Sequence, residues 1–394
     1  MTKLLDRSES AVPYIVSELE QHICDQQEEY MGEGMDEDSS LEKAIAQMGD
    51  PVSVGADLDR IHRPKMPWLM LAVYFAICLC SGILIDNRRH LIFCILSAAA
   101  CIAVCHCDFS LLGKYGGQAA VVYFAVAACL AVLDRTRVYY IDDVSYEGFS
   151  PFLITQRQIA FLGIPVFAGV LYWQRNKERF QPLIVAAVML LHLLFSCRTL
   201  SLSVLCIVFI VDYILLSRAV RNRWLGKYGW VIPVMIWTVI ILSCLLFYPQ
   251  ISPNGQLTTG LTAWFHRDSA YYDTILYETQ RMHKLFAASK WIGKCAMPDD
   301  LQNYFSIRDY LCQDYVLAML CVERGRLIAV TAAAGIMLFI TILLCQAVRQ
   351  RNQIGQFIGI SCGVTLILQG IANIMMELDW IPPVSVSFPL VGHR

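Results

Sequence analysis

Residues Leu327–Ala347 read LIAVTAAAGIMLFITILLCQA, a run without a charged side chain. A helix of this length can cross the roughly 30 Å hydrocarbon layer of a membrane. Other mostly apolar runs occupy Pro67–Ile85, Leu91–Cys105, Gln118–Leu133, Ile159–Trp173, Pro182–Phe195, Leu200–Leu216, Trp230–Phe247 and Ile354–Met375. The sequence therefore predicts an all-α, polytopic membrane protein with about nine transmembrane helices.

The composition of the chain agrees with this fold class. The sequence is 57% hydrophobic and 16% charged, whereas soluble domains are about one-quarter charged. The net charge of −2 argues against nucleic acid as a partner. Most of the 16 cysteines fall inside apolar runs, where Cys behaves as a small hydrophobic residue, so no disulfide framework is expected.

Residues 1–65 are polar and predict a separate cytosolic module of three helices. An apolar stripe predicts a helix over Tyr14–Tyr30, and further helices are expected over Leu41–Met48 and around Val54–Ile61. Because a module of this size buries little surface by itself, we expect it to dock on a partner. Residues 66–394 then form the transmembrane domain.

Basic residues beside the short loops set the expected orientation in the membrane. With the N-terminus in the cytoplasm, the cytoplasmic side receives Lys114, Arg175, Lys177, Arg179, Arg218, Arg221, Arg223, Lys227, Arg349 and Arg351. Nine spans then place the C-terminus outside, after the proline-rich segment 380–389. Such backbone needs protein or water around it at membrane depth, so we expect a tenth helix to be missing.

The long polar insert 248–326 falls outside the cell in this orientation. A single carboxylate, Asp314, lies where the insert re-enters the apolar phase. An ionisable group at that depth is by default a functional-site hypothesis. The alternative is that Asp314 is the N-cap of the eighth transmembrane helix, since aspartate favours that position. The position alone leaves both interpretations open.

Two local motifs resemble those of the SEDS family, which comprises the FtsW, RodA and SpoVE proteins. The first motif runs from Gln313-Asp314-Tyr315-Val316-Leu317-Ala318 to Val322-Glu323-Arg324-Gly325-Arg326. The second combines Gln369-Gly370-Ile371-Ala372-Asn373-Ile374 with Pro382 and Ser387-Phe388-Pro389-Leu390. Together with one large outer loop after the seventh span, the resemblance covers residues 67–390.

This resemblance implies a peptidoglycan glycosyltransferase that polymerises lipid II at the outer face of the bacterial cytoplasmic membrane, for cell shape, division or sporulation. Asp314 matches the catalytic aspartate of the family and would accept the proton of the attacking sugar hydroxyl. Lys290, Lys294 and Arg308 in the same insert are candidates for contacts with the diphosphate. Lipid II, membrane lipids and a class B transpeptidase (a penicillin-binding protein) are the implied partners.

Several further residues receive secondary roles. Glu323 is expected to be a helix-start or structural group, because nine residues of helix would separate it too far from Asp314 for an acid–base pair. Asn373 and Pro389 belong to the second motif. Arg198 occupies a segment, Phe195–Thr199, in which the family has a glutamine-proline-aspartate motif, and is a candidate for anion binding or for an interfacial position.

No cofactor is identified from the sequence. Chemistry at a diphosphate often uses a divalent cation, but no cluster with metal-ligand spacing is present, since the adjacent residues Cys105-His106-Cys107-Asp108 do not converge readily on one ion. The predicted metal site is therefore none, and a divalent cation stays possible.

The N-terminal module has a resemblance of its own. Glu18-Leu19-Glu20-Gln21-His22-Ile23 and Ala44-Ile45-Ala46-Gln47-Met48-Gly49-Asp50-Pro51 are similar to the small helical domain that precedes the membrane part of some Gram-positive permeases and cell-wall proteins.

Two other functions stay open. One is a non-catalytic membrane scaffold or regulator of cell-wall synthesis that binds a cytosolic partner through its helical head. The other is a transporter of lipid-linked peptidoglycan precursors. Against transport, no span is expected to carry the row of buried charges or the broken half-helices of a translocation path.

Overall fold

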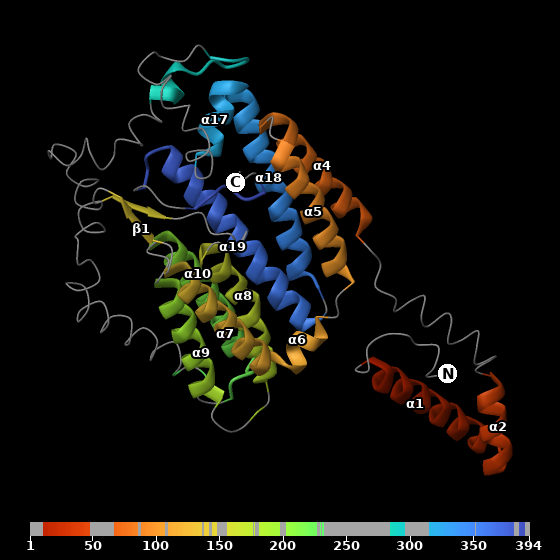
Figure 1. The fold of residues 1–394 in the computed structure, drawn as a ribbon. Helices are drawn as coiled ribbons and strands as arrows, with labels where there is room; N and C mark the ends of the chain where they lie inside the picture. Colours follow the sequence, from red (N-terminus) through yellow and green to blue (C-terminus); the bar gives the residue numbers. More distant parts are fainter. Residues whose placement is uncertain are drawn as a thin grey trace. The chain divides into compact units, whose positions relative to one another are not determined.

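The computed structural model of the chain is a helical protein (Figure 1). The structure describes residues 11–47, 67–85, 88–106, 109–135, 138–141, 144–147, 156–175, 177, 181–197, 202–226, 229, 231, 284–295, 315–350, 352–381 and 386–390. Two compact units are present, Met1–Ala72 with Cys101–Ser110, and Val73–Ala100 with Leu111–Arg394. Each is considered by itself.

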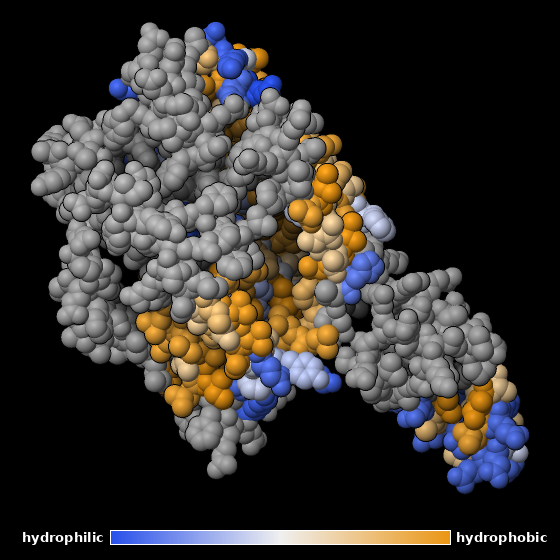
Figure 2. Space-filling model, in the orientation of Figure 1, coloured by the Kyte–Doolittle hydropathy of each residue, from blue (hydrophilic) through white to orange (hydrophobic). Residues whose placement is uncertain are grey.

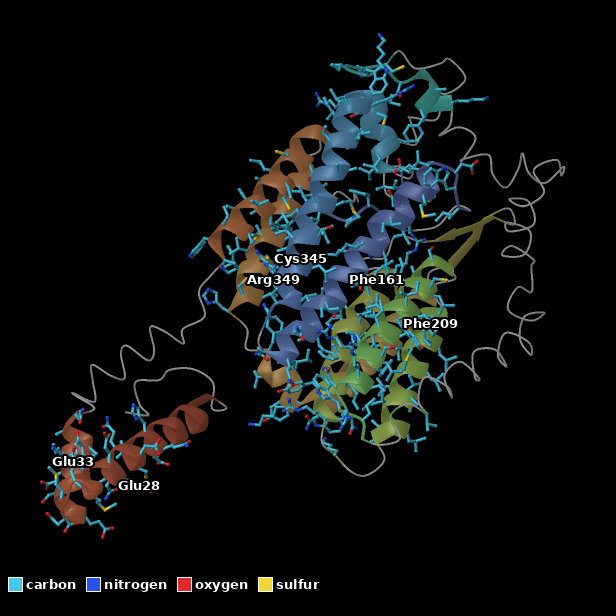
Figure 3. All side chains as sticks on the ribbon, turned by 180° about the vertical axis from the view of Figure 1, so that it is seen from behind. Glu28, Glu33, Phe161, Phe209, Cys345 and Arg349 are labelled. Atoms are coloured by element: carbon cyan, nitrogen blue, oxygen red, sulfur yellow. The ribbon has the colours of Figure 1, made fainter. Side chains whose placement is uncertain are left out.

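The N-terminal unit contains the helices α1 (Ala11–Gly32) and α2 (Glu37–Gln47), which pack against each other. Both predicted helices are present. The expected third helix, around 54–61, and the boundary at residue 65 lie outside the described residues. The chain turns between the two helices at Gly34, whose φ of +94° favours glycine. Acidic side chains such as Glu28 and Glu33 are exposed on this unit (Figure 3).

The apolar runs of the sequence form helices close to their predicted positions. These helices are α4 (Trp68–Ile85), α5 (Arg88–Cys105), α7 (Gly116–Arg135), α8 (Gln156–Trp173), α9 (Gln181–Cys197), α10 (Leu202–Arg221), α18 (Arg326–Val348) and α19 (Gln353–Glu377). The predicted span Trp230–Phe247 lies almost wholly outside the described residues. Smaller elements are α6 (Ser110–Lys114) and α17 (Val316–Glu323).

Among the described residues, three helices are long and apolar enough to cross a membrane. They cover Ser203–Arg221, Arg326–Val348 and Gln353–Glu377. The remaining apolar helices have shorter described apolar stretches. Where Figure 2 colours the surface of the helices, hydrophobic residues cover most of it. Leu183, Leu194, Val121, Val330 and Leu338 are all at least 62% exposed there, as expected where lipid chains surround a helix.

The helices α7, α8, α9 and α10 form one bundle that packs on α19 (Figure 1). Its core includes Ile164, Phe167, Met189, Val208 and Leu215. At one end, the rings of Trp224 and Phe357 stack with centroids 4.3 Å apart and so fix the end of α10 against α19. The labelled side chains Phe161 and Phe209 flank the same core (Figure 3).

In the described residues, the one departure from helical structure is a short antiparallel hairpin. Strand β1 (Val138–Ile141) pairs with β2 (Val144–Glu147), with Val138 opposite Glu147. It connects α7 to α8. No other strand occurs in the part of the chain that the structure describes, and the predicted helical fold class is confirmed.

Candidate functional site

The structure describes some of the predicted site residues and not others. Asp314, Arg308 and Arg198 lie outside the described residues. Lys290, Lys294, Glu323, Asn373 and Pro389 lie inside them. All five lie on α17 or α19 or on segments that contact α17, α18 or α19.

The motif that follows Asp314 forms two helices where the sequence predicted the start of one. α17 covers Val316–Glu323 with Tyr315 as its N-cap, and α18 begins at Arg326 with Gly325 as its N-cap. The break occurs because Gly325 has φ +104° and ψ 158°, a conformation that is almost exclusive to glycine. Of the two roles expected for Glu323, the helix-start role is wrong, because Glu323 ends α17 and the eighth transmembrane helix starts at Arg326; a structural role stays open. The N-caps of α17 and α18 are Tyr315 and Gly325, and Asp314 itself lies outside the described residues.

The N-terminus of α17 is held by a carboxylate that the sequence interpretation missed. Glu377, the last residue of α19, accepts hydrogen bonds from the backbone N–H of Leu317 at 3.2 Å and of Ala318 at 2.7 Å. Its exposed fraction is only 2%. The first N–H groups of a helix lack partners within the helix and attract negative charge. Glu377 therefore fixes the helix that begins directly after Tyr315.

One part of the polar insert is firmly attached to the junction of α17 and α18. Backbone hydrogen bonds join Gly293 N to the carbonyl of Arg324, Cys295 N to that of Val322, Arg326 N to that of Lys290, and Leu327 N to that of Trp291. Gly325 allows this close approach, since a Cβ there would lie 2.7 Å from the carbonyl oxygen of Trp291. We call residues 284–295 the strap.

The side chain of Arg326 reinforces the attachment of the strap. Its Nε donates to the hydroxyl of Ser289 at 2.8 Å, and its Nη2 donates to the carbonyls of Phe286 at 2.5 Å and Ala287 at 3.1 Å. A planar guanidinium can reach several acceptors at once in this way. The strap is thus tied to α18 through one side chain as well as through the backbone.

The predicted cations Lys290 and Lys294 both lie on the strap. Both side chains are exposed, and they flank Trp291 and Ile292, which are 70% and 69% exposed. The structure therefore brings these two lysines to one short segment beside α17. Their contact with a diphosphate stays a proposal.

The second motif meets the first at α17. Asn373 of α19 is fully buried, and its Nδ2 donates to the carbonyl of Val386 at 2.9 Å. Phe388 is 1% exposed and belongs to one core with Val316, Leu317 and Leu320. Pro389 follows it in the turn at 389–390. The segments that carry the two sequence motifs therefore pack together.

Nucleophilic chemistry by the buried thiol of Cys321 is disfavoured. Burial, and then the nearby Glu377 carboxylate, raise the pKa of Cys321 to about 11, against a smaller lowering by Arg326. The thiol is therefore neutral at neutral pH and a poor nucleophile. In addition, no three His, Cys, Asp or Glu side chains gather into a metal site among the described residues.

No family model and no curated protein match the sequence of this chain. A solved chain from a peptidoglycan synthase complex, studied for the coordination of polymerization and crosslinking, superposes with a TM-score of 0.57. The match covers 83% of this chain and 92% of that chain at 14% sequence identity. At this identity, the likeness shows a shared fold alone.

A second buried polar group, which the sequence interpretation also missed, lies inside the bundle. His192 of α9 and Asp212 of α10 form an ion-pair contact of 2.7 Å and are 1% and 0% exposed. The expectation concerned a row of buried charges on one span. In the described residues, α9 and α10 instead contribute one residue each to a single buried ionisable pair. Each apolar run contains a single such residue at its buried face, a signal that was available in the sequence.

Proposed function

We propose that this chain is a peptidoglycan glycosyltransferase-like membrane protein that polymerises lipid II, with Asp314 as the general base. The observation that carries the proposal is the shared fold with a chain of a peptidoglycan synthase complex. The motif from Gln313 to Arg326, which resembles that of the SEDS family, supports it independently of the fold. The reaction would take place at the outer face of the cytoplasmic membrane.

The proposed reaction is the attack of a sugar hydroxyl on the anomeric carbon of a lipid-linked sugar. A new glycosidic C–O bond forms, the bond to the diphosphate breaks, and the hydroxyl proton passes to the carboxylate of Asp314. Lys290, Lys294 and Arg308 would stabilise the departing diphosphate, whose negative charge favours charge-assisted hydrogen bonds. A divalent cation would serve the same purpose if one binds.

The geometry next to Asp314 supports this assignment. Asp314 directly precedes Tyr315, which is 5% exposed and is the N-cap of α17. Because Glu377, the strap and Phe388 all hold α17, the polypeptide at residue 315 is well fixed. A catalytic base needs such a fixed position, since small displacements cost a large part of the rate.

A transpeptidase of the penicillin-binding class is the proposed partner. The solved complex with the similar fold concerns polymerization and crosslinking together. Because the new glycan must be crosslinked, a partner that joins peptides would act on the product of this chain.

The test is lipid II polymerisation by the purified chain, with products separated by length. Asp314→Asn should abolish polymer, and Asp299→Asn, a matched change in the same insert, should leave it intact. Membrane abundance and the thermal unfolding midpoint should be equal for the three proteins. Polymer of normal length from Asp314→Asn would refute the assignment of the base, and its absence from the wild type would refute the activity.

A scaffold role is the second candidate, and the N-terminal unit favours it. The acidic side chains of α1 and α2 are exposed, and those of Glu20, Asp25, Glu28, Glu37 and Glu42 offer a surface for a basic cytosolic partner. Under this role, Asp314→Asn would leave the cell-wall phenotype unchanged, whereas deletion of residues 1–60 would remove it. Transport of fluorescent lipid II into proteoliposomes without polymer would instead indicate a transporter.

A further inference from the structure

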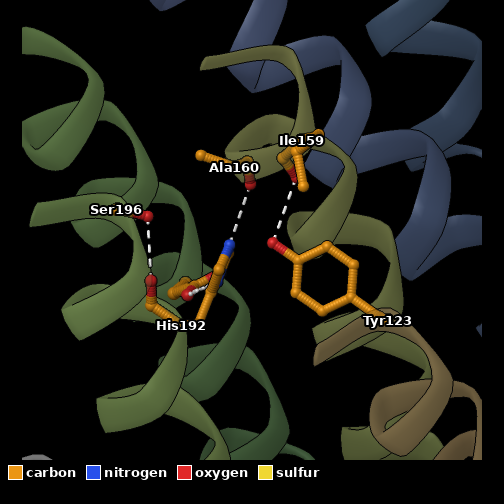
Figure 4. A network of polar contacts seen from close by, with 6 residues as sticks. Tyr123, Ile159, Ala160, His192 and Ser196 are labelled. Atoms are coloured by element: carbon orange, nitrogen blue, oxygen red, sulfur yellow. Dashed lines mark hydrogen bonds and ion pairs between the residues drawn. The ribbon is translucent and has the colours of Figure 1, made fainter. Parts of the chain in front are cut away.

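The buried pair in the bundle connects three helices through one imidazole ring (Figure 4). His192 Nδ1 of α9 lies 2.7 Å from Asp212 Oδ2 of α10, and His192 Nε2 lies 2.9 Å from the carbonyl oxygen of Ala160 of α8. The second carboxylate oxygen, Asp212 Oδ1, is buried without a hydrogen-bond partner in the described part of the chain. None of these features belongs to the proposed glycosyltransferase site.

The two contacts of the ring determine where its protons lie. A carbonyl oxygen can only accept, so the contact with Ala160 assigns a hydrogen atom to Nε2. In a neutral imidazole with that tautomer, Nδ1 is a bare acceptor. A contact of 2.7 Å with a carboxylate oxygen then requires another proton between Nδ1 and Oδ2. The pair is therefore either an imidazolium with a carboxylate or a neutral imidazole with a carboxylic acid.

We infer that His192 and Asp212 form a proton-binding site inside the helical bundle, and that the bound proton ties α9 to α10. Both arrangements of the pair hold the same proton and have no net charge. Loss of the proton would leave two lone pairs facing each other and one uncompensated negative charge in the bundle. That state is strongly unfavourable in a buried site, so deprotonation would separate the two side chains.

Within the described part of the chain, His192 is the one ion-pair partner of Asp212, so the shared proton is what neutralises this carboxylate. From α7, Tyr123 places its ring edge-on to the imidazole at a centroid distance of 6.0 Å, and its hydroxyl donates to the carbonyl of Ile159 at 3.0 Å. On α9, Ser196 donates to the carbonyl of His192 at 2.8 Å. α19 contributes apolar side chains to the adjoining core, namely Ile358, Val364, Leu368 and Ala372.

The helix α8 is shaped to admit the ring. A Cβ on Gly163 would lie 2.3 Å from His192 Nε2 and 2.5 Å from the Tyr123 hydroxyl, so only glycine leaves room for both groups. The charged residue of α8 is Arg157, which lies about one turn before Ala160 and is partly exposed. Among the residues that the structure describes, the site therefore comprises one acid, one base and the hydroxyl of Tyr123. Ionisable groups buried in membrane helices are uncommon and by default functional.

The site predicts that the stability of the protein depends on pH with a defined sign. The hydrogen bond between His192 and Asp212, which joins α9 to α10, is complete at low pH, where the proton is bound. It is lost as the pH rises and the proton leaves, so stability falls towards alkaline pH. Asp212→Asn is the informative variant, because an amide N–H donates to Nδ1 of a neutral histidine and preserves the hydrogen bond between α9 and α10 without a proton that titrates between about pH 6 and about pH 9. Asp212→Leu removes the hydrogen bond to His192 at every pH.

The experiment measures the thermal unfolding midpoint of the full chain in detergent from about pH 6 to about pH 9. Towards alkaline pH, the midpoint of the wild type should fall by about 3 °C or more relative to the midpoint of Asp212→Asn. The midpoint of Asp212→Leu should be lower than both at acidic pH and should not show this fall. Parallel pH profiles for the wild type and Asp212→Asn would overturn the inference.

A second measurement keeps the test decisive if Asp212→Asn fails to fold. In the wild type labelled with ¹⁵N-histidine, the His192 signal is identified by its loss in His192→Gln. At acidic pH, an Nδ1 that either carries the proton or accepts a hydrogen bond from Asp212 Oδ2, and that loses this proton or hydrogen bond at alkaline pH, supports the site. An Nδ1 with neither a proton nor a hydrogen bond at every pH overturns it. Neither readout depends on lipid II polymerisation.

Discussion

The carboxylate of Glu377 lies 2.7 Å from the backbone nitrogen of Ala318, so the end of one long helix caps the start of a short one. The two residues are 59 positions apart in the sequence. This contact orients α17, and therefore the polypeptide on the C-terminal side of Asp314. A residue that touches no substrate can in this way position the proposed catalytic segment.

Replacement of Glu377 should destabilise α17. In Glu377→Ala, the N–H groups of Leu317 and Ala318 lose a buried acceptor, at a cost on the order of 1–3 kcal/mol for each group left unsatisfied. Glu377→Gln keeps one acceptor oxygen and should lie between the wild type and the alanine variant. Thermal unfolding in detergent measures the order of the three midpoints.

The control for Glu377 is Asp379→Asn. Asp379 is a partly exposed carboxylate two residues along, and its φ of +58° also suits asparagine. This variant should change the midpoint less than Glu377→Gln does. Equal midpoints for the wild type and Glu377→Ala would contradict the capping role.

The sequence predicts the helices well because their apolar length is a local property. The predicted run Ile354–Met375, for example, became α19 with bounds Gln353–Glu377. The helix α10 runs beyond the predicted Leu216 to Arg221, since Arg218 and Arg221 can direct their charges to the interface while their stems stay on the helix. Periodicity alone cannot locate an end of this kind.

The polar contacts were harder to predict because they join distant segments. Nothing local to Glu377 indicates that Leu317 and Ala318 need an acceptor. The pair His192 and Asp212 was more accessible, because each is an isolated ionisable residue in one of two successive apolar runs. The break at Gly325 was missed for a different reason: glycine is common in membrane helices, and its φ is set here by the strap.

Gly325→Ala should detach the strap from the junction of α17 and α18. The new Cβ would meet the carbonyl oxygen of Trp291 at 2.7 Å and Ile292 Cα at 2.8 Å, and the φ of +104° is itself strained for alanine. We expect a loss on the order of 1–3 kcal/mol for the backbone conformation, and more for the overlap. The thermal unfolding midpoint measures the sum.

Gly293→Ala separates the two effects of Gly325→Ala. Gly293 has a φ of +86°, but nothing lies within 4 Å of its Cβ position. It should therefore show backbone strain without overlap and should destabilise less. If Gly293→Ala proves as harmful as Gly325→Ala, the close approach of Trp291 is not what requires glycine.

Arg326→Lys should loosen the strap while leaving the net charge unchanged. A lysine ammonium cannot reproduce the fork that reaches Ser289, Phe286 and Ala287 together. A loss of about 1–2 kcal/mol in local stability would raise the open population about 5- to 30-fold. Limited trypsin digestion, followed at Lys290 and Lys294, should accelerate accordingly.

Arg324→Lys is the matched control for the strap, since it makes the same chemical change two residues away. Its backbone carbonyl, which accepts from Gly293, is retained in the variant. Cleavage at Lys290 and Lys294 should stay close to the wild-type rate. Equal acceleration by both variants would show that the guanidinium of Arg326 has no special part in holding the strap.

Gly163→Ala tests the close packing of α8 against the buried imidazole. The added Cβ would overlap His192 Nε2 and the Tyr123 hydroxyl, so α9 or the ring must move, at a cost of about 1–3 kcal/mol. Gly335→Ala in α18 is the control, because nothing lies within 4 Å of its Cβ position and alanine favours a helix. Gly163→Ala should lower the thermal unfolding midpoint, whereas Gly335→Ala should leave it unchanged or raise it. A midpoint for Gly163→Ala at or above that of Gly335→Ala would mean that the imidazole does not occupy the place where the structure puts it.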